Sequence, residues 1–190
     1  MKINGGDWCM LEVVTRAIEQ FYIKKDYQAF KQQCGKPLHL PIELKEYIHA
    51  KGLKLIEGED TVCTSKAWKA CFDTYKNGEF EVTHTTMLQI SKVAPLFFMR
   101  NDFVIPSRDP DTLEPELKGW DCQACTIEQY DLLEEMRNVL QVQGYHEVFY
   151  RDLIEVAPGF DIPEGKEKLG RNVTVEHLLF MDIFDILKGS

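Results

Sequence analysis

The chain has 190 residues, of which 44% are hydrophobic and 28% are charged. These proportions are typical of a globular domain and exclude a disordered or fibrous chain. The formal net charge of −9 argues against general nucleic-acid binding through phosphates, and the longest apolar runs fall far short of the ~20 residues of a membrane-spanning helix.

Charge is distributed unevenly along the chain. The first 95 residues hold 13 basic and 12 acidic side chains, whereas the last 95 hold 9 basic and 19 acidic ones. The negative excess therefore lies in the second half, which indicates either one acidic surface or a general contribution to solubility.

The six cysteines and the N-terminal residues bear on the cellular compartment. The first residues contain no basic segment leading into an apolar stretch, so we expect no secretory signal. The chain is also longer than most disulfide-stabilised secreted domains. We therefore expect reduced thiols and a cytoplasmic location.

The N-terminal part of the chain is predicted to be mainly helical. Apolar residues at three- and four-residue steps predict a long helix over 7–33, with a kink or break at 23–26. A second helix is expected over 41–52, because Pro41 suits the first helical position and Gly52 the end. A short strand over 53–57 and a third helix over 64–75 follow.

The middle of the chain changes to a two-residue period. Apolar and polar residues alternate over 79–91, which predicts a half-buried strand. Residues 96–99 and 103–105 predict one or two further strands, pairing antiparallel with the first. The proline-rich, acidic segment 106–119 is predicted to be a long exposed loop.

The C-terminal part is predicted to contain two more helices. Thr126 begins a capping-box pattern, so a helix is expected to about residue 143. A strand over 146–156, a loop over 158–170 and a final helix capped by Thr174 follow. In the helix that begins at Thr126, the residues expected to be buried are Ile127, Tyr130, Leu133, Met136, Val139 and Leu140.

The order of these elements predicts the fold class. Helices at both ends enclose a block of strands without regular βαβ alternation, which favours an α+β fold with an antiparallel sheet. No Gly/Ser-rich linker marks a boundary, so we expect one domain over 1–190.

Cys122 and Cys125 form a Cys-x-x-Cys motif just before the helix predicted from Thr126. Thiolates at this spacing can share a metal ion, and a helix N-terminus stabilises a thiolate. A structural zinc site needs two more ligands, usually a second close pair, and the other cysteines and histidines offer none. We expect two small buried residues and no cofactor, with a metal-stabilised module as an alternative.

His84 lies on the apparently inward side of the strand over 79–91. An imidazole among apolar residues is either a core side chain with a satisfied hydrogen bond or a catalytic group. A small hydrolase or transferase would need a cysteine or carboxylate within about 3 Å of His84. The core interpretation is preferred, so we expect a non-enzyme and keep the catalytic one as the alternative.

The function that we favour is non-catalytic binding of a basic protein partner. Acidic surfaces accelerate association with basic proteins and compete for sites that otherwise hold nucleic acid. Small immunity proteins and DNA-mimicking inhibitors use this physics, and the analogy to them is one of charge and size only. The residues predicted to contact the partner are Asp109, Asp111, Glu114, Glu116, Trp120, Asp121, Tyr130 and Glu134. Neither nucleic acid nor a membrane is expected as a direct partner.

Overall fold

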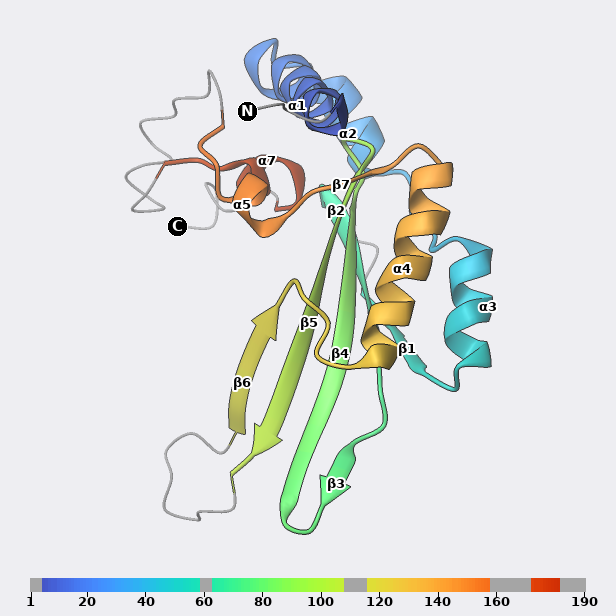
Figure 1. Ribbon diagram of the computed structural model, residues 1–190. Coiled ribbons are helices and arrows are strands. Elements are labelled where there is room, and N and C mark those ends of the chain that lie inside the picture. Colours follow the sequence, from blue (N-terminus) through green and yellow to red (C-terminus); the bar gives the residue numbers. More distant parts are fainter. Residues whose placement is uncertain (1–4, 59–62, 108–115, 158–171, 182–190) are drawn as a thin grey trace.

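Helices at both ends of the chain enclose an antiparallel sheet, which confirms the predicted α+β class (Figure 1). The computed structural model describes residues 5–58, 63–107, 116–157 and 172–181, with side chains from residue 12 onward. No helix in these ranges is both long enough and apolar enough to span a bilayer. The extent of the domain, 1–190, stays a prediction.

The described strands form one seven-stranded sheet with the main order β1-β2-β4-β5-β6. All pairs along this path are antiparallel, β3 pairs with the far end of β4, and the short β7 pairs parallel with β5. The strands are β1 (Lys54–Glu57), β2 (Ser65–Cys71), β3 (Tyr75–Asn77), β4 (Phe80–Ser91), β5 (Leu96–Pro106), β6 (Glu116–Asp121) and β7 (His146–Glu147).

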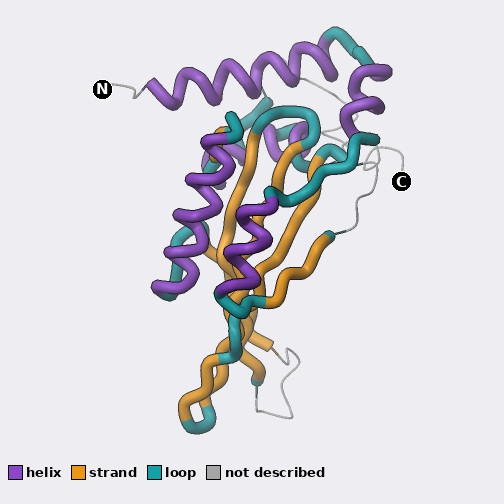
Figure 2. Tube along the Cα trace, turned by 90° about the vertical axis from the view of Figure 1, so that its right-hand side faces the viewer, coloured by secondary structure: helices purple, strands orange, loops and turns teal. Residues whose placement is uncertain are grey.

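The described helices fall into two groups around this sheet. In Figures 1 and 2, α3 and α4 run along one face of the sheet, and α1 crosses the end where β4 turns into β5. The helical segments are α1 (Gly5–Ile18), the π-helical turn η1 (Glu19–Ile23), α2 (Tyr27–Cys34), α3 (Ile42–Ala50), α4 (Ile127–Val142), α5 (Tyr150–Leu153) and α7 (Val175–Leu179).

One hydrophobic cluster lies between the sheet and the pair α3 and α4. The two-residue period of the strands sends alternate side chains to this face, where they meet the apolar stripes of the two helices. Side chains buried in this way contribute about 1.5–3 kcal/mol each. The fully buried ones include Trp68, Leu88, Phe97, Leu44, Ile48, Leu132, Met136 and Leu140.

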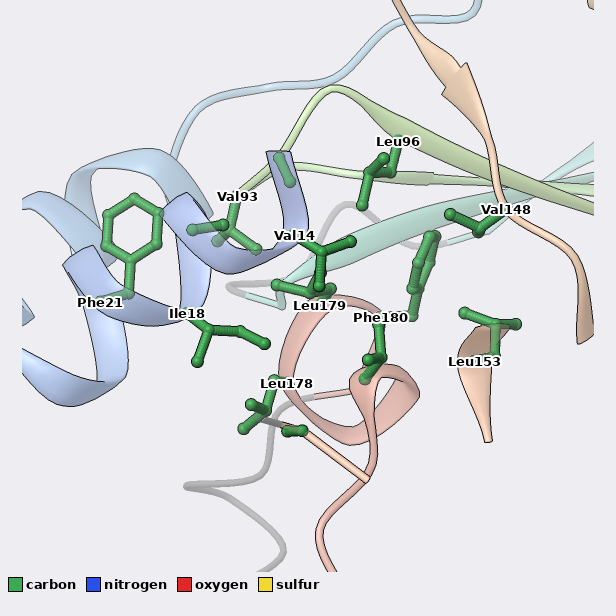
Figure 3. Packing of buried hydrophobic residues seen from close by; sticks show 14 of the residues in the cluster. Val14, Ile18, Phe21, Val93, Leu96, Val148, Leu153, Leu178, Leu179 and Phe180 are labelled. Atoms are coloured by element: carbon green, nitrogen blue, oxygen red, sulfur yellow. The ribbon is translucent and has the colours of Figure 1, made fainter. Parts of the chain in front are cut away.

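A second cluster joins α1, η1, α2, α5 and α7 to the opposite face of the sheet and its upper end. Figure 3 shows Val14 and Ile18 of α1 beside Leu178 and Leu179 of α7. The hydroxyl of Tyr22 also donates a hydrogen bond to the carbonyl of Leu178. The two ends of the chain are therefore held together by apolar packing around one buried polar contact.

The end of α7 is fixed by side chains of the sheet. Ser91 Oγ donates to the carbonyl of Leu179 at 2.7 Å, and Ser65 Oγ donates to that of Phe180 at the same distance. Carbonyls at a helix C-terminus have no partner within the helix, so these serines supply what the helix lacks. The predicted helix from Thr174 thus ends at Leu179, and residues after 181 lie outside the described ones.

The break predicted at 23–26 is confirmed. The first helix ends in the π-helical turn η1, and Lys25 adopts a φ of 57°. Asp26 then caps α2, because its Oδ1 accepts a hydrogen bond from the amide of Ala29 at 3.1 Å. A left-handed residue cannot continue a right-handed helix, so the chain changes direction here.

The third predicted helix, 64–75, is wrong, because this segment forms β2 and leads into β3. Lys66, Trp68 and Ala70 are buried in alternation with more exposed neighbours. The buried lysine obscured the two-residue period. Its ammonium lies 2.7 Å from the carboxylate of Glu57 and 3.1 Å from the carbonyl of Leu38, so its charge is compensated inside the fold.

Of the one or two strands expected over 96–105, the structure has one, β5, which is continuous over 96–106. Two further expectations need correction. The loop predicted over 106–119 ends earlier because β6 begins at Glu116. The strand predicted over 146–156 is only two residues long and is followed by α5. The side chain of Asp152 caps this helix by accepting from the amide of Phe149 at 2.8 Å. The loop over 158–170 lies outside the described residues.

Candidate binding site

A hollow lies at the edge of the sheet beside β5. Strand β6 pairs with β5 from residue 101 onward, and β7 pairs only with residues 96 and 97. Residues 98–100 therefore lie between the two partner strands. The hollow has a volume of about 690 Å³ and is lined by Cys122, Gln123, Ala124, Cys125, Thr126, Ile127, Tyr130, Leu133, Arg137 and Phe149.

Two buried side chains of the sheet hold the loop between β6 and α4. Thr86 Oγ1 donates to Asn101 Oδ1 at 2.7 Å, and Asn101 Nδ2 donates to the carbonyl of Gln123 at 3.0 Å. Both Thr86 and Asn101 are almost completely buried. A buried amide with both its oxygen and its nitrogen engaged fixes the geometry of what it binds.

The other end of this loop is fixed by the start of α4. Thr126 Oγ1 accepts from the amide of Gln129 at 3.1 Å, which confirms the predicted cap. The side chain of Gln129 accepts from the amide of Cys125 at 3.0 Å, one residue earlier than in a standard capping box. The loop that carries both cysteines is thus anchored at each end.

The first turn of α4 presents apolar side chains to the outside. Ile127 is 80% exposed and Tyr130 is 57% exposed, so the prediction that both are buried is wrong. The buried stripe consists instead of Gln129, Leu132, Leu133, Met136 and Leu140. Because Ile127 and Tyr130 line the hollow with Phe149, which is also exposed, they form an apolar rim and not part of the core.

Trp120 continues the apolar rim along β6. It is 44% exposed and packs edge-to-face against Tyr150, with the ring centroids 4.9 Å apart. The guanidinium of Arg100 lies 5.7 Å from the centroid of the Trp120 ring. Such pairs hold large aromatic side chains in place at a surface.

Arg137 forms the polar wall of the hollow. Its guanidinium binds both carboxylate oxygens of Glu147, at 2.6 and 3.0 Å, and also the carboxylate of Glu134. The hydrogen bond with Glu147 is the main reason that the pKa of Arg137 is raised above its ordinary value. Glu134, one of the predicted contact residues, is therefore half-buried and already paired.

The remaining carboxylates of α4 differ from Glu134. Among the described residues, Glu128, Asp131 and Glu135 have no ion-pair partner. Glu128 and Asp131 are exposed, and Glu135 is half-buried. Helix α4 thus carries negative charge that no described cation neutralises.

The other acidic residues predicted to bind a partner have different positions. Asp109, Asp111 and Glu114 lie outside the described residues. Glu116 forms an ion pair with Lys118 at 2.8 Å. Asp121 is exposed, but its Oδ1 accepts from the amide of Gln123 at 2.8 Å and so stabilises the loop.

The two cysteines of the motif have different environments. Cys125 is exposed, whereas Cys122 is half-buried and packs against the second hydrophobic cluster. Burial raises the pKa of the Cys122 thiol, opposed by a hydrogen bond from the backbone of Tyr150. Within the described ranges, no group of three or more His, Cys, Asp or Glu side chains is placed to hold a metal ion.

His84 lies away from the hollow, on the face of the sheet that α4 covers farther along. It is half-buried, and its Nδ1 has no hydrogen-bond partner. None of the described thiols or carboxylates is hydrogen-bonded to its ring, so the pairing that the hydrolase alternative requires is not formed there.

Of the residues that sequence reasoning singled out, Tyr130, Cys122 and Cys125 line the hollow, whereas Ile127 and Phe149 were not among its candidates. Both are apolar: the helical stripe assigned Ile127 to the core, and Phe149 was predicted to lie in a strand. Comparison of this chain with protein-family models, with curated proteins and with solved structures finds no match. Function must therefore be argued from the site itself.

Proposed function

We propose that the chain is a non-catalytic binding protein that engages a basic protein partner through the hollow and the first turns of α4. The observation that carries the proposal is the combination on α4 of two exposed apolar side chains, Ile127 and Tyr130, with the unpaired carboxylates Asp131 and Glu135. In this proposal the chain acts as an inhibitor, and its partner is a basic protein of the kind that immunity proteins neutralise. Binding takes place in the cytoplasm.

The two kinds of side chain have separate roles in this proposal. Exposed aromatic residues that can be desolvated at the centre of an interface supply most of the binding free energy. Carboxylates around them attract a basic partner over distance and raise the association rate. The anchored loop supports the proposal, because a surface that is fixed before binding loses less entropy when the complex forms.

Two sets of substitutions test the proposal once a partner has been isolated by affinity purification. In the first, Asp131→Asn with Glu135→Gln should lower the association rate constant about two- to tenfold at low salt and flatten its dependence on ionic strength. In the second, Tyr130→Ala should raise the dissociation rate constant at least tenfold. Surface plasmon resonance at several salt concentrations measures both.

Control variants separate a local effect from a general one. Glu43→Gln with Glu46→Gln removes the same charge from exposed positions on α3 and should leave both rate constants unchanged. Asp109→Asn, Asp111→Asn and Glu114→Gln together test the acidic residues outside the described ranges. A partner whose kinetics respond to none of the variants near α4 contradicts the proposal.

A further inference from the structure

A second concavity lies on the sheet face beyond the N-terminal end of α4. Strands β4 and β5 extend past this end of the helix (Figure 1), so the first residues of β4 and the last residues of β5 form the floor of a groove of about 670 Å³. The residues that line it are Phe72, Asp73, Thr74, Tyr75, Phe80, Val82, His84, Phe103, Ile105, Thr126 and Glu128. This volume is within the range of small-molecule sites.

The walls of the groove are mainly aromatic. Phe72, Tyr75, Phe80 and Phe103 line it from four different strands or their ends. Tyr75 is 56% exposed and Phe80 is 48% exposed, so neither side chain is buried in the hydrophobic core. Aromatic rings attract cations through their quadrupoles, by about 0.5–2 kcal/mol according to exposure.

Gly119 keeps one of these rings at the edge of the groove. It lies opposite Phe103 in the pairing of β5 with β6, and a Cβ atom there would be 2.4 Å from the ring. The ring therefore lies over Gly119, in the space that any other residue would fill. This position leaves the floor beside His84 open.

His84 is the polar group in the floor of the groove. Its imidazole forms no hydrogen bond with the described residues, and its Nδ1 is buried. Leaving a buried polar atom without a partner costs about 1–3 kcal/mol. The ring therefore offers the groove a hydrogen-bonding group that no described residue occupies.

The charged groups of the groove are both acidic. Asp73 and Glu128 are exposed, and neither has an ion-pair partner among the described residues. The N-terminus of α4 opposes a cation with about half a positive charge, which is less than the two full negative charges. The two carboxylates and the aromatic walls therefore both favour a cationic ligand.

We infer that this groove binds a primary organic ammonium ion with an aromatic or branched apolar body. The apolar body lies over Val82 and the aromatic side chains, the ammonium lies toward Asp73 and Glu128, and His84 hydrogen-bonds to the ligand. The inference does not depend on the proposed partner binding at the hollow.

Three probes of equal size and different charge test the inference: benzylammonium, benzyl alcohol and benzoate. Titration into isotope-labelled protein, followed by NMR of the ring signals of His84 and Phe103, should show saturable binding of benzylammonium. Benzyl alcohol should bind about tenfold more weakly, because it keeps the apolar contacts and loses the charge. Benzoate should bind more weakly still.

Matched variants connect any binding to this groove. Asp73→Asn with Glu128→Gln should reduce the affinity for benzylammonium to that for benzyl alcohol and leave the latter unchanged. Both positions are exposed, so this variant should fold. Glu43→Gln with Glu46→Gln on α3 is the charge-matched control. His84→Leu should weaken the binding of benzylammonium. Far-UV circular dichroism checks that this variant is folded.

The same ammonium chemistry occurs in free amines and in lysine side chains of proteins. Nα-acetyl-lysine amide is the probe for the second source, and tighter binding of it than of benzylammonium would identify a protein side chain as the ligand. The inference is overturned if benzylammonium shows no saturable binding, if benzoate or benzyl alcohol binds as tightly, or if the charge variant and its α3 control behave alike.

Discussion

Cys122 and Cys125 are three residues apart and yet differ in burial. Burial raises the pKa of the Cys122 thiol, so its thiolate fraction at a given pH is smaller. Cys125 is exposed. We expect iodoacetamide at pH 8 to modify Cys125 at least tenfold faster than Cys122, as measured by peptide mass spectrometry over time.

The reactivity of Cys122 also reports on the anchoring of the loop. Repeating the reaction in urea above the unfolding midpoint should make the two rates similar, because burial is then lost. Equal rates in the native protein would contradict the described environment of Cys122.

The side chain of Asn101 connects β4, β5 and the loop after β6. Replacing it with alanine leaves Thr86 Oγ1 and the carbonyl of Gln123 without these partners. We expect Asn101→Ala to lower the free energy of unfolding by about 2–4 kcal/mol, measured by urea denaturation.

A second variant distinguishes lost hydrogen bonds from lost packing at this site. In Asn101→Val with Thr86→Val, the buried hydroxyl is removed together with its acceptor, so part of the loss should be recovered. Asn138→Ala, at an exposed position of α4, should change stability by less than about 0.5 kcal/mol. A double variant less stable than Asn101→Ala would show that packing dominates.

At the scale of the elements, sequence periodicity identified those that bury one uninterrupted apolar stripe. Helices α3 and α4 and strand β4 were predicted within one or two residues, since each has such a stripe and a clear cap or turn. Strand β2 was missed because Lys66 occupies a core position, and charge at that position breaks the apparent pattern.

The candidate site was less predictable than the fold. Its chemistry depends on which face of α4 meets the sheet, and the helix is rotated so that Gln129 is buried and Ile127 is exposed. The buried glutamine is explained only by the amide of Cys125 that it binds. A tertiary partner of this kind leaves no periodic signal in the sequence.

A buried cation of β2, Lys66, forms an ion pair with Glu57 at the end of β1. The hydrogen bond from Lys66 lowers the pKa of Glu57 below its ordinary value of 4.5. A lowered pKa means that the ion pair stabilises the fold above about pH 4.5 and that this stabilisation is lost as pH falls through the folded-state pKa.

The variant Glu57→Gln tests this pH dependence. Because Glu57 is partly exposed, we expect a loss of about 1 kcal/mol at pH 7. The difference from the unsubstituted protein should shrink toward zero as pH falls below 4, in chemical denaturation measured across that range. A difference that stays constant with pH would exclude the ion pair as its cause.

At the scale of the whole molecule, several carboxylates of the second half are paired with nearby basic side chains. In the described ranges, Glu116 pairs with Lys118, and both Glu134 and Glu147 pair with Arg137. The carboxylates of α4 that remain unpaired, Glu128, Asp131 and Glu135, lie on one element. Net charge alone did not identify them, because pairing is decided by the fold.

Thr126 lines both the hollow and the groove. The start of α4 therefore separates the two cavities: Ile127 lines the hollow and Glu128 lines the groove. A ligand or partner that displaces the start of α4 by binding in one cavity changes the dimensions of the other cavity. By thermodynamic reciprocity, the second occupant would then influence the first to the same degree.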